Sequence, residues 1–169
     1  MTKLTFVFMA LASVLRLIPH PFGITPFCAT GLFAGTQLNK WKAPLYMMLG
    51  LAIGDAIIGF YDFRVLGFVY IGFLLCPIIG RLLLSADATN TRLAGVVVIN
   101  ATVFFIVSNI GNWWAFHPHT LEGLVTNYIN GLPYYAAAII GDLFYSLLIF
   151  RGFQLLSPLA AAKQKTVSS

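Results

Sequence analysis

The feature that most constrains this chain is a long apolar stretch near its C-terminus that contains one aspartate. The stretch from Leu132 to Leu156 is long enough to cross a bilayer, for which about 20 helical residues suffice. Asp142 lies inside it, where a carboxylate costs roughly 2.5–3.5 kcal/mol on insertion unless it finds a partner or water. The tripeptide Ile-Gly-Asp occurs a second time and ends at Asp55, in another apolar run. A functional interpretation therefore has to explain both aspartates.

The composition indicates an integral membrane protein. Of the 169 residues, 59% are hydrophobic and 9% are charged, whereas a soluble domain carries roughly 25% charged residues. A soluble fold of this size has too little interior for so many apolar side chains. The net charge of +5 comes from basic residues that stand singly or in pairs between apolar stretches, a pattern that does not indicate nucleic-acid binding.

The apolar stretches predict an all-α bundle of six transmembrane helices. The expected spans are Leu4–Ile18, Phe27–Leu38, Ala43–Phe60, Val65–Leu84, Leu93–Ile110 and Leu132–Leu156. The second is short for a span, and its Gly31-xxx-Gly35 pattern predicts close packing against another helix. Residues 111–131 are expected to form a connection with a short surface helix, for which Thr120 is the N-cap and Glu122 stands in the first turn. Residues 1–158 then form one domain, and residues 159–169 a disordered cytoplasmic tail.

The basic residues predict that both termini lie in the cytoplasm. With six crossings and an internal N-terminus, eight of the ten lysines and arginines fall on the inner side, and only Arg16 and Arg64 on the outer side. The same topology gathers the unusual polar groups at the outer end, while the inner halves of the spans are almost purely apolar. We therefore expect a polar cavity that opens to the outside.

The candidate ligand-binding residues follow from this asymmetry. They are Arg16, His20, Thr25, Asp55, Asn109, Trp113, Trp114 and Asp142. The arginine and the two aspartates would supply charge, the asparagine a hydrogen bond, and the tryptophans a flat apolar surface. Structural roles stay open, because Arg16 can neutralise an aspartate and tryptophans also gather at membrane surfaces. No zinc-protease motif, serine elbow or phosphate loop occurs in the sequence, and we expect no enzyme, metal or cofactor.

Three segments resemble an uncharacterised family of small bacterial membrane proteins. They are Arg16–Phe27 (RLIPHPFGITPF), Ser108–Trp114 (SNIGNWW) and Leu132–Tyr145, which begins LPYY and ends GDLFY. Those proteins look like the substrate-capture (S) components of energy-coupling-factor (ECF) vitamin transporters. The resemblance implies a six-helix bundle in the bacterial inner membrane, with a ligand pocket between the outer helix ends. It also implies a partner, a membrane coupling subunit with two ATPases.

We therefore expect a membrane protein that captures a small vitamin-like metabolite from the outer side for uptake. One alternative is a helper or assembly protein that binds other membrane helices, which a Gly31/Gly35 face turned toward lipid would favour. Another is an intramembrane aspartyl-type enzyme in which Asp55 and Asp142 share a proton and activate water. The last is a solitary cobalamin transporter of the kind that the resemblance suggests, with Cys28 as a ligand of cobalt.

Overall fold

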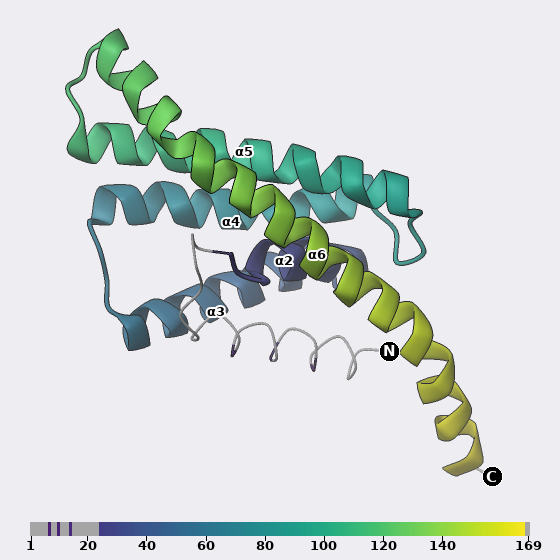
Figure 1. The fold of residues 1–169 in the computed structure, drawn as a ribbon. Coiled ribbons are helices and arrows are strands. Elements are labelled where there is room, and N and C mark those ends of the chain that lie inside the picture. The colour runs from purple at the N-terminus through teal and green to yellow at the C-terminus, as the bar shows by residue number, and fades with distance from the viewer. Residues whose placement is uncertain (1–6, 8–9, 11–13, 15–23, 168–169) are drawn as a thin grey trace.

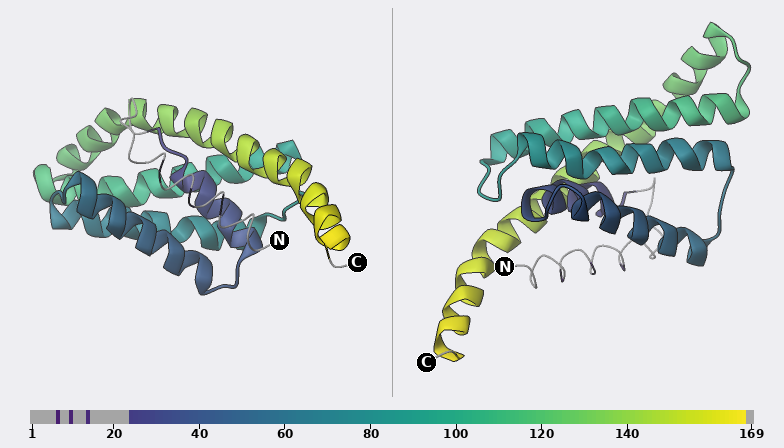
Figure 2. Two further views of the ribbon diagram at one scale, coloured as in Figure 1. Left: turned by 90° about the horizontal axis from the view of Figure 1, so that it is seen from below. Right: turned by 180° about the vertical axis from the view of Figure 1, so that it is seen from behind.

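The bundle is all-helical in the part of the chain that the structure, a computed structural model, describes: residues 7, 10, 14 and 24–167, with side chains up to Pro158. The labelled helices are α2 (Phe27–Gln37), α3 (Lys42–Ile58), α4 (Phe63–Leu83), α5 (Asn90–Phe116) and α6 (Leu121–Val167). Helices α4 and α5 run antiparallel beside each other, and α6 packs diagonally against α5 and α2 (Figure 1). The view from below shows α2 between α3 and α6 (Figure 2).

Three of these helices are long and apolar enough to cross a membrane. They are Phe63–Leu83, Asn90–Phe116 and the Leu121–Pro158 part of α6. The chain is therefore a membrane protein with transmembrane helices. Helix α3 has 17 residues and α2 only 11, both fewer than the ~20 that span a bilayer upright. The expected first span, Leu4–Ile18, lies mostly outside the described residues, so the six-span bundle and its orientation stay predictions.

The short helix α2 is buried along most of its length. All residues from Phe27 to Gly35 are buried, which confirms the expected packing of this stretch among its neighbours. The ring of Phe33 packs edge-on against Phe150 and Phe153 of α6, with ring centroids 5.3 and 5.0 Å away. These aromatic contacts lie in the main hydrophobic core, which α2, α5 and α6 share.

Two glycines let the backbones of α2 and α4 touch. A Cβ atom at Gly35 would lie 2.1 Å from the carbonyl oxygen of Pro77, and one at Gly80 would lie 2.1 Å from that of Leu32. Both distances are far inside van der Waals contact, so a larger residue would push the helices apart. The Gly31-xxx-Gly35 pattern therefore faces α4, as a close-packing motif should.

Two boundaries differ from the sequence prediction. Helix α5 continues to Phe116 and α6 begins at Leu121, so the connection spans residues 117–120 instead of 111–131. The N-cap was predicted correctly, since the Thr120 hydroxyl accepts a hydrogen bond of 3.1 Å from the Gly123 amide and Glu122 stands in the first turn. Polar residues before and after the connection, such as Asn112 and Asn130, lie on α5 and α6, so their polarity does not mark a loop.

The end of the bundle opposite this connection is fastened by polar side chains of α6. The Arg151 guanidinium donates to the Asn90 side chain and, over 3.1 Å, to the carbonyl of Ala88. Gln154 donates to the carbonyl of Ala86 over 2.8 Å. Helix α6 then continues past the other helices to Val167, through most of the segment that the sequence predicts as a disordered tail from residue 159 (Figure 2).

The backbone contact between α2 and α4 predicts that alanine lowers stability at one glycine of α4 and not at another. Gly80→Ala should lower the free energy of unfolding by about 1–3 kcal/mol, because its methyl group meets the backbone of Leu32. Gly67→Ala is the matched control on α4, since nothing lies within 4 Å of its added Cβ. Unfolding of both variants in detergent micelles measures the difference, and equal stability of the two would contradict this packing.

The N-cap of α4 makes a prediction about pH. The Asp62 carboxylate accepts hydrogen bonds from the Arg64 side chain (2.8 and 3.1 Å) and from its backbone amide (2.9 Å), which lowers the pKa of Asp62 to about 2. Because this pKa lies below the ordinary value of about 3.9, the cap contributes stability above about pH 4 and loses it as the pH falls through 2. A carboxyl-carbon NMR titration should give a midpoint near 2, and Arg64→Ala should raise it. An ordinary midpoint in the unchanged protein would show that the ion pair does not form.

Candidate functional site

A cavity of about 530 Å³ lies where α4 begins, α5 ends and α6 begins. Small-molecule sites have volumes of about 300–1,000 Å³, so the cavity has the size of a ligand site. Its described walls come from these three helices, and α4 contributes Val65 and Val69 from its first two turns. The other walls are the facing sides of α5 and α6.

Helical spacing brings the cavity residues of α5 and α6 to facing sides. Those of α5 are Ala101, Phe104, Phe105, Ser108, Asn109 and Asn112, and those of α6 are Asn127, Asn130, Gly131, Tyr134, Tyr135 and Ala138. Both sets recur at intervals of three and four, which is one face of a helix. Because α5 and α6 are antiparallel here, the polar residues of both helices gather near the connection and the alanines stand at the far end.

Asparagine side chains join the two helices at the end near the connection. The Asn112 amide donates to Asn127 Oδ1 over 2.5 Å, and Asn127 Nδ2 donates to the backbone carbonyl of Asn109 over 2.9 Å. Asn109 in turn donates to the carbonyl of Phe105 over 2.8 Å. Asn127 is only 1% exposed, and its amide needs these partners because an unpaired buried amide costs about 1–3 kcal/mol. The amides are therefore held in place without any ion pair among them.

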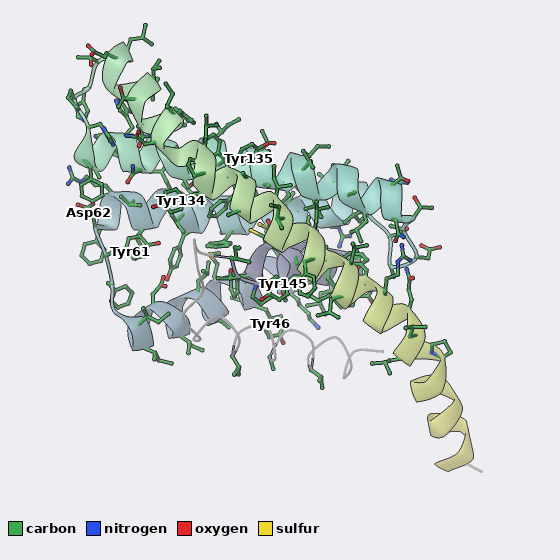
Figure 3. All side chains as sticks on the ribbon, viewed as in Figure 1. Tyr46, Tyr61, Asp62, Tyr134, Tyr135 and Tyr145 are labelled. Atoms are coloured by element: carbon green, nitrogen blue, oxygen red, sulfur yellow. The ribbon has the colours of Figure 1, made fainter. Side chains whose placement is uncertain are left out.

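Aromatic rings form the middle of the cavity. The Tyr135 ring stacks on Phe105 with centroids 4.7 Å apart and planes inclined by 26°, and its hydroxyl is 2.7 Å from the Thr102 hydroxyl. Tyr134 precedes it in the cavity wall. Figure 3 shows both tyrosines where α6 passes α4 and α5, farther into the bundle than Asp62 at the start of α4.

Of the described residues that the sequence suggested for ligand binding, only Asn109 lines this cavity. Arg16 and His20 lie outside the described residues. Thr25 is half-buried just before α2, away from the cavity wall.

The two tryptophans pack around the connection instead of covering the cavity. The Trp113 indole donates to the carbonyl of Pro118 over 2.9 Å, and its ring lies 5.4 Å from that of His119. Trp114 is half exposed and packs edge-on against Phe68 of α4 at 5.9 Å. These contacts fix the turn between α5 and α6.

Both aspartates are buried away from the cavity wall. Asp55 is 3% exposed on α3 and Asp142 is 6% exposed on α6. Asp142 faces the Cys28 thiol of α2, whose sulfur lies 3.6 Å from that of Cys76. The helices that carry the two aspartates, α3 and α6, do not pack closely, since no Cα atom of one lies within 8 Å of a Cα atom of the other. The arrangement thus gives no support to an aspartate pair.

Sequence reasoning missed most of the cavity residues on α6. Asn127, Asn130 and Tyr134 are spaced by three and four positions, which is a helical signal. The sequence prediction places the first two in a connection and the third in a separate span, so it does not show the continuous face.

The fold and the cavity define a helical membrane protein with a ligand-sized hollow between three membrane-capable helices. A model of the family of unknown function DUF6580 matches residues 1–165, and the chain belongs to this family. No curated protein and no solved structure matches the chain.

The asparagine network makes a prediction about stability. Asn127→Ala should lower the free energy of unfolding by about 1–3 kcal/mol, because it leaves the Asn112 amide without its acceptor and removes the hydrogen bond to the Asn109 carbonyl. Asn130→Ala, one turn along the same helix and exposed, should change it by about 0.5 kcal/mol or less. Unfolding in detergent micelles measures both, and a neutral Asn127→Ala would show that the network does not join the helices.

Proposed function

We propose that this chain is a bacterial inner-membrane protein that captures a small vitamin-like metabolite from the outer side for uptake. The observation that carries the proposal is the cavity of about 530 Å³ with amide groups converging from α5 and α6. A purely structural bundle would fill such a space with apolar side chains, because protein interiors pack densely and buried amides cost free energy. A hollow with ordered polar groups is what a small ligand requires.

The position of the cavity supports capture from outside. It lies next to the connections at residues 59–62 and 117–120. In the topology that the basic residues predict, both connections are on the outer side. A ligand would then enter from the periplasmic face without crossing the packed core around α2.

The energy for uptake would come from a partner. The sequence has no GxxxxGK[ST] phosphate loop, so we do not expect the chain itself to hydrolyse ATP. A membrane coupling subunit with ATPases is the partner that the resemblance to S components suggests.

The observations that would favour the alternatives do not occur in the described part of the chain. Gly31 and Gly35 face Cys76 and Pro77 of α4, so this small-residue face is not turned toward lipid for a helper role. Cys28 is buried beside Cys76 and is not part of the cavity wall. Its thiol is therefore not placed to bind the cobalt of a ligand in the cavity.

The test is to identify what the protein binds. Protein purified gently in mild detergent should carry a small molecule that native mass spectrometry detects and that denaturation releases. Ala138→Trp fills the far end of the cavity and should lower the occupancy about tenfold or more, whereas Thr126→Ala, outside the wall, should leave it unchanged. Unfolding temperatures confirm that both variants fold. The proposal would be refuted if the protein carried no bound molecule. It would also be refuted if Ala138→Trp carried as much of the molecule as the unchanged protein.

A further inference from the structure

We infer that the cavity selects an uncharged, planar molecule that carries an amide-like hydrogen-bonding group at one end of a ring. The inference rests on the proposed function and names the class of ligand for the same cavity. It departs from the sequence-based expectation, in which charged side chains hold the ligand.

The first support is the charge of the cavity. No lysine, arginine, histidine, aspartate or glutamate occurs among its described wall residues. An ion that leaves water for a site without a counter-charge loses several kcal/mol of solvation that amide dipoles only partly restore. Asp55 and Asp142, the acidic groups buried in the described helices, lie outside the wall. A neutral molecule enters the cavity without this cost.

The second support is the order of side chains along the cavity. Asn112, Asn127 and Asn130 stand at the end near the connection, the stacked Phe105 and Tyr135 in the middle, and alanines at the far end. Aromatic walls favour a flat apolar ring, and the small alanines leave room for it. The cavity thus matches a ring that enters with its apolar edge first.

The third support is the hydrogen-bonding capacity that remains. Asn112 Nδ2 and both polar atoms of Asn127 are already engaged within the network. Asn112 Oδ1 and the whole amide of Asn130 have no partner among the described residues and stand in the wall. An amide presents one acceptor and two donor hydrogens, so these groups complement a ligand edge that both donates and accepts.

The experiment uses three probes of nearly equal shape, namely benzamide, benzoate and benzamidinium, at pH 7. Saturation-transfer NMR with the full chain in micelles ranks their affinities. Neutral benzamide should bind about tenfold more tightly than either ion, and Ala138→Trp should abolish the signal. Asn130→Asp places a carboxylate in the wall and should shift the preference toward benzamidinium by about tenfold. Thr126→Asp is the control, one turn nearer the connection and outside the wall, and should shift it by about threefold or less.

Each other outcome overturns the inference. A charged probe that binds best and is lost in Ala138→Trp would refute the ligand class but leave a functional cavity. Loss of benzoate binding in Arg16→Ala would show that a charge from outside the described wall holds the ligand. Failure of all three probes would also refute the class, while the proposed function is judged separately by the molecule that purifies with the protein.

Discussion

The structure depends on the contact between the backbones of α2 and α4. At Gly35 and Gly80, the Cα atom of one helix lies against a backbone carbonyl of the other. Any residue with a Cβ atom would be too large for this approach. Helix α2 is also the one described helix that contacts all four others, α3 to α6. Since membrane helices gain little from the hydrophobic effect against lipid, such close packing is a main source of their association. The position of α2 therefore affects the spacing of all the other helices that the structure describes.

The shortness of α2 also explains where the cavity lies. The Phe27 ring of α2 packs against Phe73 of α4, and the carbonyl of Leu38, just after α2, accepts a hydrogen bond from Arg81 of α4. The cavity residues of α4, Val65 and Val69, stand earlier on the same helix. Among the described residues, the central helix thus fills only the half of the bundle toward the C-terminal end of α4. In that half, the glycine contact packs α2 tightly against α4. In the other half, where α2 does not reach, space remains between α4, α5 and α6.

The sequence predicts those features of the structure that depend on residues close together in the chain. Burial of α2, close packing at Gly35 and the cap at Thr120 depend on patterns within a few residues, and the structure confirms them. The asparagine-lined face was missed because the prediction separates Asn112 and Asn127 from the neighbouring spans, and because the pairing of their side chains depends on how α5 packs against α6. The sequence also marks Asp55 and Asp142 as unusual, but it does not tell a cavity from a helix contact.

The chain separates its polar groups into two kinds of environment, and this separation bears on function. The two buried carboxyl groups, those of Asp55 and Asp142, lie outside the cavity wall, while amides and phenols line the hollow. The uptake site that we propose would have to release what it binds. Neutral hydrogen bonds contribute only about 0.5–1.5 kcal/mol each, so a few of them with an aromatic surface give selectivity without irreversible binding. A charged pair buried at membrane depth would bind its ligand so strongly that release would be slow. An amide-lined cavity would bind more weakly and so would allow release.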